Sequence, residues 1–246
     1  MIAGGYGSII VEIKNKYPFL GKLLSLIYPP STILNTMPRK VIKQVKNLLF
    51  NFGKNKVLNI GCGSAIGCGR RLWNNIDKTN ILNVDIESGP DVDMIADAHN
   101  LPFENETFDS VIMQAVIEHL HSPNLAVEEA FRVLKNGGYL YLEVPFLQGF
   151  HADPYDYQRY TQVGLEKLVE KFNKIILAGV SVGPICSLIW ILRDLFSNLT
   201  KYKTVNYIIR FIISWILSPF RYLDYLIYNT RASKRLACEY YILIQK

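Results

Sequence analysis

The stretch that most constrains the fold is residues 57–69, VLNIGCGSAIGCG. Its opening VLNI predicts a short buried strand, and glycines follow at positions 61, 63, 67 and 69. Glycine tolerates positive φ and lets a ligand approach the backbone, and a strand that turns into a helix points free N–H groups at that ligand. The stretch therefore predicts a site for a small, polar, nucleotide-like ligand, with a plain tight turn as the alternative.

Size and cysteine usage indicate the class of protein. With 246 residues, 50% of them hydrophobic, the chain is long enough for one large domain with a full core. The four cysteines form no CxxC pair, which favours reduced thiols and a cytoplasmic location. The N-terminal segment lacks the basic region and long apolar run of a cleaved signal peptide, so we expect none.

The positive charge is concentrated in one segment. Residues 201–235 contain seven lysines and arginines and the single acid Asp224. The net charge of this segment is therefore +6, equal to that of the whole chain. These charges alternate with Ile, Leu, Phe, Trp and Tyr. That mixture favours a membrane surface over nucleic acid as the partner.

Hydrophobic periodicity predicts alternating strands and helices. We expect strands at 56–60, 81–86, 94–96, 108–114, 139–144, 174–180 and 236–245, and helices at 38–52, 124–134 and 163–172. Asn124 is the predicted cap of the second helix, and Gly137 its predicted terminator. Alternating strands and helices imply a mostly parallel sheet with helices on both faces.

Polar residues follow several of the predicted strands. Asp85 ends the second strand, where an acid can accept hydrogen bonds from ribose hydroxyls, and Asp97 follows the third. A carboxylate at Asp97 could accept a hydrogen bond from an adenine amine, and Ala98 adds a backbone N–H. Gly61 and Gln114 stand at two further strand ends, so all these residues are expected at the ligand-binding edge. The alternatives are a solvated loop acid for Asp85 and an Asx turn for Asp97.

Five motifs together resemble class I S-adenosylmethionine (SAM)-dependent methyltransferases of the methyltransferase type 11 kind. They are VLNIGCG at 57–63, NVDIE at 83–87, DAHNLPF at 97–103, FDSVIMQAVIEHL at 108–120 and RVLKNGGYLYLEVP at 132–145. The resemblance covers about residues 40–180 and the final strand. It implies a Rossmann-like α/β fold whose mostly parallel sheet has an antiparallel last strand.

The resemblance also implies SAM as the cofactor. The residues implied to bind it are Asn59, Gly61, Cys62, Gly63, Asp85, Ile86, Asp97, Ala98 and Gln114. The glycine turn would wrap the methionine part, Asp85 would bind the ribose, and Asp97 with Ala98 would bind the adenine. Gln114 would lie near the sulfonium. Many family members carry an acid at the position of Asn59, and Asn can contact the SAM amino group only without a full charge.

The resemblance divides the chain into four parts. We expect an N-terminal helical or lid segment at 1–37, a SAM-binding core at 38–180, a hydrophobic, basic helical insertion at 181–235 and the last core strand at 236–246. The insertion separates two strands that usually form a near-hairpin in this family.

The segment 150–161, FHADPYDYQRYT, supplies the candidate catalytic residues. It follows the fifth strand and should overhang the same end of the sheet. We assign catalysis to His151, Asp153 and His119, of which a histidine could remove the proton of an acceptor hydroxyl. The alternative is a packed loop in which Arg159 pairs with Asp153 or Asp156. No metal site is expected, because His151 and Asp153 alone supply only two ligands.

The insertion points to a membrane surface or to a second subunit. Residues 211–220 are too few to span a bilayer, which needs about 20 apolar residues. We expect in-plane contact of residues 185–228 with the inner face of a membrane, or alternatively a homodimer interface.

These observations predict a SAM-dependent methyltransferase that O-methylates a glycan or lipid-linked acceptor at a membrane face, with no nucleic-acid partner. A quinone or lipid methyltransferase and a non-catalytic scaffold with the SAM-binding fold are the alternatives. A nicotinamide dehydrogenase is disfavoured, because the third glycine of its G-x-G-x-x-G motif would fall at Ile66.

Overall fold

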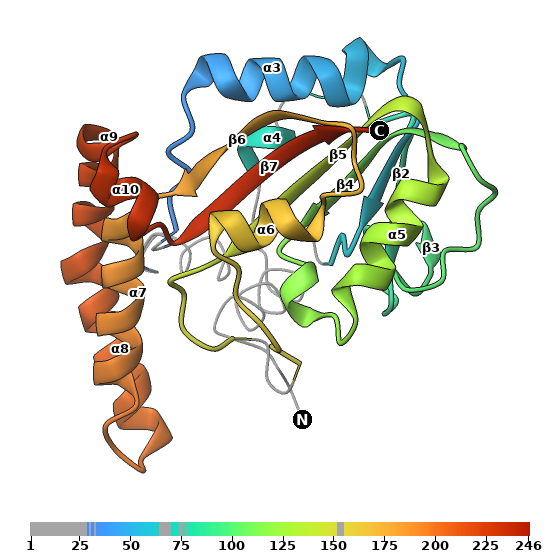
Figure 1. Ribbon diagram of the computed structural model, residues 1–246. Coiled ribbons are helices and arrows are strands. Elements are labelled where there is room, and N and C mark those ends of the chain that lie inside the picture. Colours follow the sequence, from blue (N-terminus) through green and yellow to red (C-terminus); the bar gives the residue numbers. More distant parts are fainter. Residues whose placement is uncertain are drawn as a thin grey trace.

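A computed structural model describes residues 29, 31, 33–63, 70–73, 76, 78–151 and 155–246. Strands among these residues form one seven-stranded sheet in the order β3-β2-β1-β4-β5-β7-β6 (Figure 1). They are β1 (Val57–Ile60), β2 (Ile81–Asp85), β3 (Met94–Ile95), β4 (Phe108–Gln114), β5 (Leu134–Pro145), β6 (Lys174–Val182) and β7 (Glu239–Gln245).

Strand direction confirms the predicted fold class. The first five strands pair in parallel, so their carboxyl ends share one edge of the sheet. The last strand, β7, lies between β5 and β6 and is antiparallel to both. An open sheet of this kind binds its ligands beyond the carboxyl ends of the parallel strands.

Alternating strand residues pack against helices on the two faces. On one face, α3 (Arg39–Phe50) and α4 (Arg70–Trp73) cover a cluster that includes Val57, Ile112 and Tyr141. On the other, α5 (Pro123–Val133) and α6 (Gln162–Leu168) cover a larger cluster that includes Leu58 and Val111. Both faces are therefore buried, as a parallel sheet requires.

Two predicted details of the helix before β5 are wrong. The helix begins at Pro123 with Ser122 as its N-cap residue, rather than with Asn124 as the cap, because proline suits the first helical turn. It ends at Val133, and β5 begins at the next residue. Gly137, with φ of +78°, therefore lies within the strand, and its N–H donates to the Lys246 carbonyl at 3.0 Å.

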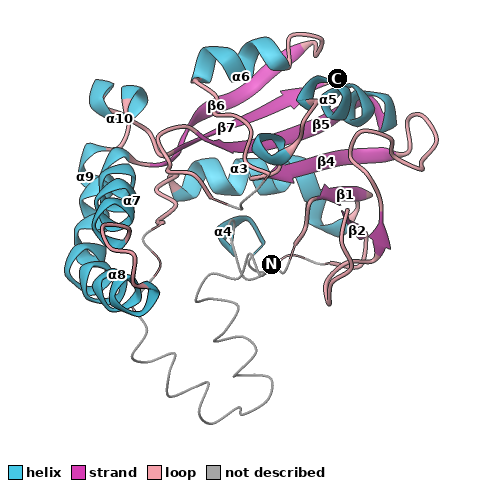
Figure 2. Cartoon of the chain, turned by 90° about the horizontal axis from the view of Figure 1, so that it is seen from below, coloured by secondary structure: helices cyan, strands magenta, loops and turns pink. Residues whose placement is uncertain are grey.

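The segment between β6 and β7 is helical. It contains α7 (Pro184–Ser197), α8 (Lys203–Leu217), the 3₁₀ turn η3 (Ser218–Leu223), α9 (Asp224–Ile227) and α10 (Arg231–Arg235). Helices α7 and α8 pack side by side at one end of the sheet, beyond β6 (Figures 1 and 2). Among the described residues, no helix is both long and apolar enough to cross a membrane. Most of the predicted N-terminal segment 1–37 lies outside the described residues.

Asp224, the first residue of α9, joins α9 to the start of α7. Its buried carboxylate accepts hydrogen bonds from the backbone N–H groups of Ile185 (2.8 Å) and Cys186 (2.9 Å), in the first turn of α7. A carboxylate at this position satisfies free N–H groups and interacts favourably with the helix dipole. A Cβ on Gly183 would lie 2.4 Å from the Asp224 side chain, so glycine leaves room for the cap.

Candidate functional site

The glycine turn after β1 requires glycine for two reasons. Gly61 and Gly63 have φ of +68° and +52°, which side chains rarely adopt. A Cβ on Gly61 would also lie 2.4 Å from Cγ2 of Val116, whereas the space around Gly63 is open to 4 Å. The turn is therefore packed on one side against the segment after β4 and open on the other.

Asp85 links the end of β2 to this turn. Its Oδ2 accepts a hydrogen bond from the Gly63 N–H at 2.8 Å, and its Oδ1 accepts one from the Glu87 N–H at 3.2 Å. A carboxylate has about four acceptor sites, so both oxygens can still accept from a diol. Ile86, next along the chain, is 64% exposed and offers an apolar surface at the same edge.

Cys62 lies between the two glycines of the turn. Its Sγ is 3.8 Å from the Asp91 carbonyl oxygen, and burial, followed by the charge of Asp85, raises the pKa of its thiol to about 11. The thiol is therefore protonated at neutral pH. Cys62 thus contributes its backbone and a neutral side chain to the turn.

Asp97 is fixed in the turn after β3. Its Oδ1 accepts the backbone N–H of His99 at 2.9 Å and lies 2.7 Å from the His99 Nδ1. These contacts, led by the backbone hydrogen bond, lower the pKa of Asp97. The His99 ring stacks on His121 with centroids 4.2 Å apart, so this turn contacts the segment between η2 and α5. Ala98 is buried beside them.

Gln114, at the end of β4, is held from both sides. Its Oε1 accepts a hydrogen bond from the Trp73 indole at 2.7 Å, and its Nε2 donates to Glu143 at 2.7 Å. Burial raises the pKa of Glu143. Asn59 donates from Nδ2 to the Asn83 side chain at 2.9 Å, which joins β1 to β2. Gln114 and Asn59 are therefore locked in position within the sheet.

Two of the predicted catalytic residues lie together. The rings of His119 and His151 meet edge to face with centroids 5.0 Å apart. Burial lowers the pKa of His151, but the nearby carboxylates of Glu118 and Asp156 raise it by more, so it lies above its usual value. Asp153, the third predicted catalytic residue, lies outside the described residues.

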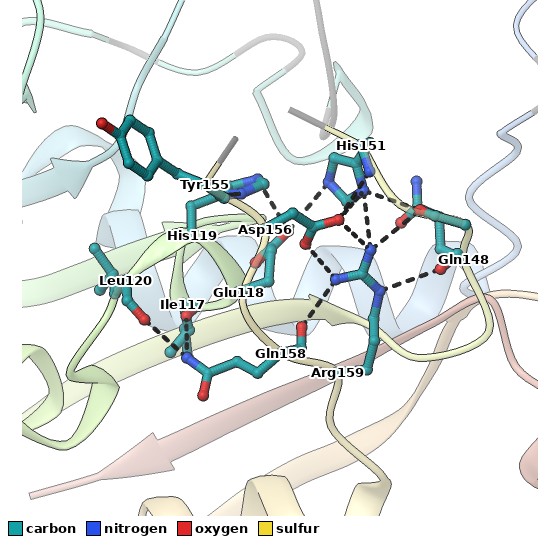
Figure 3. Close-up of polar contacts among 11 residues, drawn as sticks. Ile117, Glu118, His119, Leu120, Gln148, His151, Tyr155, Asp156, Gln158 and Arg159 are labelled. Carbon is teal, nitrogen blue, oxygen red and sulfur yellow. Dashed lines mark hydrogen bonds and ion pairs between the residues drawn. The ribbon is translucent and has the colours of Figure 1, made fainter. Parts of the chain in front are cut away.

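Arg159 organises the loop that carries His151 (Figure 3). All five of its N–H donors have acceptors: Nε donates to the Gln148 carbonyl, Nη1 to the Gln158 carbonyl and to Asp156, and Nη2 to the Gly149 carbonyl and again to Asp156. The partner is thus Asp156, one of the two acids considered from the sequence. Burial raises the Asp156 pKa, but the hydrogen bonds from Arg159 outweigh it and the net pKa is lowered.

Gln158 ties this loop to the segment after β4. Its Nε2 donates to the carbonyl oxygens of Ile117 (3.0 Å) and Leu120 (2.9 Å), within and next to the 3₁₀ turn η2 (Ile117–His119). The same segment includes Val116, which contacts the glycine turn. One short stretch of chain therefore adjoins the glycine turn at its start, and it includes His119 near its end.

Glu118 is the residue of this site that sequence reasoning missed. Its side chain is fully buried, and its Oε1 lies 3.7 Å from Nε2 of His119 and 3.8 Å from Nε2 of His151. The IEHL sequence at 117–120 gave no sign of this, because an acid beside a histidine is usually solvated.

Comparison with known proteins places this site in context. Residues 58–142 match the family described as "Methyltransferase domain". A tRNA (carboxymethyluridine(34)-5-O)-methyltransferase of Arabidopsis thaliana is 33% identical over 95 residues, which are 36% of this chain and 23% of that protein. A demethylmenaquinone methyltransferase of Protochlamydia amoebophila (strain UWE25) is 43% identical over 47 residues, 19% of each chain. The chain thus spans less than a quarter of either relative.

Solved structures share the fold at low sequence identity. The [4+2]-cyclase SpnF superposes with a TM-score of 0.52 and 15% identity, covering 84% of this chain and 80% of that one. A putative sarcosine dimethylglycine methyltransferase from Galdieria sulphuraria gives a TM-score of 0.51 and 14% identity, covering 84% and 85%. Since one of these proteins is named as a cyclase, the fold by itself does not determine the reaction.

Proposed function

We propose that this protein, whose residues 58–142 match the methyltransferase domain, transfers the SAM methyl group to an oxygen of a glycan or lipid-linked acceptor. The observation that carries the proposal is the hydrogen bond between Asp85 and the Gly63 N–H. It joins Asp85, the acid that we assign to the ribose, and the turn that would hold the methionine part into one preformed unit. Such preformed sites bind with less loss of entropy.

The chemistry needs alignment and one proton acceptor. In O-methylation the acceptor oxygen attacks the methyl carbon, the carbon–sulfur bond breaks, and S-adenosylhomocysteine leaves with the bonding electron pair. The hydroxyl proton passes to a base. Holding the reacting atoms in line supplies several kcal/mol of the barrier reduction, and a positioned base contributes about 10²–10⁴-fold. We assign the acceptor contact to His119 and His151, with Asp153 as a further member of the site.

The helical segment 184–235 supports a membrane-bound acceptor. Large apolar side chains on α7, α8, η3, α9 and the α7–α8 connection are exposed, Leu226 at 79% and Leu199 at 65%. The others are Leu188, Ile191, Leu195, Phe196, Tyr202, Val205, Tyr207, Ile208, Phe211, Ile212, Trp215, Ile216, Phe220, Tyr222, Leu223 and Tyr225. Exposed apolar surface of this extent marks an interaction site, and the interspersed lysines and arginines favour an anionic lipid surface.

A quinone or lipid acceptor is the second candidate. The match with the demethylmenaquinone methyltransferase favours it, and such an acceptor would also be reached from a membrane. Both candidates share the membrane-facing helices and the SAM site, so they differ only in the acceptor. A non-catalytic scaffold is the third alternative.

Methyl transfer can be tested directly with isotope-labelled SAM. The protein is incubated with labelled SAM and, separately, with a membrane lipid extract, a glycan fraction or demethylated quinones, and products are identified by mass spectrometry. Label in a glycan or lipid-linked glycan supports the first proposal, and label in a quinone supports the second. SAM binding in calorimetry without label transfer to any fraction would favour the scaffold.

A further inference from the structure

Three potential metal ligands meet where the two segments of the site join. Glu118, His119 and His151 each offer one donor atom, and the three atoms lie within 4.8 Å of one another. Two of the three residues come from the turn after β4 and the third from the loop after β5 (Figure 3). From this arrangement we propose that the protein binds a divalent transition-metal ion of the kind that Zn²⁺ represents.

The carboxylate of Glu118 supplies the first argument. Its side chain is fully buried, and among the residues that the structure describes none donates a hydrogen bond to either of its oxygens. Burying an ionised carboxylate without hydrogen bonds is very costly unless a cation or metal compensates it. The two imidazole nitrogens that face Oε1 are 3.7 and 3.8 Å away, beyond hydrogen-bond distance. A metal ion between the three atoms would satisfy the carboxylate.

His119 is oriented as a metal ligand. Its Nδ1 lies 2.6 Å from the backbone carbonyl oxygen of Tyr155. A carbonyl oxygen only accepts, so Nδ1 carries the hydrogen, and in the neutral ring Nε2 has a free lone pair directed toward Glu118. Metal-bound histidines usually donate their other ring N–H to a carbonyl or carboxylate in this way.

His151 has the same orientation. Its Nδ1 faces the Gly149 carbonyl oxygen at 3.3 Å and Asp156 Oδ2 at 3.5 Å, both of which are acceptors. Arg159 Nη2 is also 3.3 Å away, but its two hydrogens are donated to Gly149 and Asp156. Nδ1 is therefore the protonated nitrogen, and Nε2 of the neutral ring points at Glu118.

The two distances from Glu118 are close to those of a metal site, and the nitrogens of His119 and His151 lie within 4.8 Å of each other. Bonds of about 2.1 Å around a tetrahedral ion place donors about 3.4 Å apart. The two measured separations exceed this by a few tenths of an ångström. Two imidazoles and one carboxylate suit Zn²⁺ and related ions, and such a set leaves a fourth position for water or substrate. The sequence-based expectation of no metal counted His151 and Asp153 alone and did not include buried Glu118.

The role of this metal site in methyl transfer rests on the proposed function. An acceptor hydroxyl in the fourth position would be bound and made more acidic by the ion. Nε2 of His119 and Nε2 of His151 would then be ligands instead of proton acceptors, and the hydroxyl proton would pass to water. Metal binding itself requires neither SAM nor an acceptor, so it can be tested independently of methyl transfer.

The experiment uses the full chain after removal of metals by a chelator. Zn²⁺ is titrated in by calorimetry and Co²⁺ by visible absorption, in the absence of SAM and acceptor. We expect one ion per chain at micromolar affinity, and cobalt absorption typical of nitrogen and oxygen ligands. Glu118→Gln, which preserves the side-chain shape, should weaken binding by more than about 100-fold. Asp156→Asn, which weakens the support of His151 and the contacts of Asp156 with Arg159 but removes no ligand, should weaken it by roughly 10–100-fold.

Controls separate this site from adventitious binding. His121→Asn removes a histidine outside the group and should leave the affinity unchanged. His119→Gln serves as a second test if Glu118→Gln does not fold, since His119 is partly exposed. The proposal is overturned if the wild type binds neither ion at micromolar concentration, or if folded Glu118→Gln or His119→Gln binds as tightly as the wild type. Methyl transfer without metal binding would overturn this inference and leave the proposed function intact.

Discussion

Arg159→Lys tests whether the guanidinium clamp holds the histidine loop in place. Arginine uses five donors here, whereas lysine has three donors at a single point and keeps the charge. At least two of the five acceptor contacts are therefore lost. An unsatisfied buried acceptor costs about 1–3 kcal/mol, which gives about 2–6 kcal/mol for two. Arg159 is 23% exposed, so water can replace part of this loss and we expect about 2–3 kcal/mol.

The loss is measured as the free energy of unfolding in urea, with the m-value as a check on two-state behaviour. Arg132→Lys is a matched control, because Arg132 also uses five donors, on Glu129, Asn105 and the carbonyls of Leu101 and Phe103. We expect similar destabilisation from both variants. Only Arg159→Lys should also lower methyl transfer, by roughly 10²-fold, because it displaces His151.

Two results would refute this reasoning. The first is a free energy of unfolding of Arg159→Lys within about 0.5 kcal/mol of the wild-type value, because the five contacts would then contribute no more to stability than an ordinary surface residue. If Arg159→Lys and Arg132→Lys reduce turnover equally at a temperature where both are folded, the loop has no specific role in positioning His151.

The remaining predictions concern the cofactor, stability and location. Asp85→Ala should weaken SAM binding by about 1.5–3 kcal/mol in calorimetry, and an affinity within twofold of wild type would rule out the ribose role. Burial, together with the charges of Glu143 and Glu118, raises the pKa of Glu239 in the folded protein. The contribution of Glu239 to stability is therefore complete below its pKa in the unfolded chain, about 4.3, and is lost as pH rises through its pKa in the folded protein. The free energy of unfolding of Glu239→Gln should therefore equal that of the wild type in acid. Between the two pKa values its advantage over the wild type should grow by about 1.4 kcal/mol for each pH unit. A difference in urea unfolding that does not change with pH would contradict this. The protein should sediment with anionic liposomes more than with neutral ones, and high salt should weaken this without abolishing it. Replacing three exposed cations by Gln should have the same effect as salt: Lys201, Lys203 and Arg231. A monomer that stays in the supernatant at low salt would refute the membrane proposal, and a stable dimer would favour a subunit interface.

Much of the sheet could be predicted because its strands are strongly apolar and end in recognisable turns. Residues 57–60, 81–85 and 108–114 form strands within a residue of the predicted limits. The junction at Val133 and Leu134 could not be predicted, because the start of β5 is set by pairing of Leu134 with Phe108 across the sheet. Local sequence around Gly137 resembles a helix end, and tertiary pairing overrides it.

Most residues of the candidate site could be predicted from the sequence, but the contacts between them could not. Asp85 and His151 follow from their places after strands. The bond from Gly63 to Asp85 and the burial of Glu118 depend on how separate segments pack, and a single sequence does not encode that in any local pattern. The pairing of Arg159 with Asp156 likewise depends on the path of the loop.

The pairing of β6 with β7 brings the two ends of the helical segment together. Val182 and Glu239 are paired neighbours in the sheet, so the two ends of residues 183–238 leave the core side by side. Antiparallel neighbours of this kind can be joined by a turn of two to five residues. A tight hairpin could thus replace α7–α10 without changing the strand pairing. Such a shortened chain would lose Trp190 of α7, whose ring lies 6.2 Å from that of His151, so the helical segment also forms one wall of the histidine site.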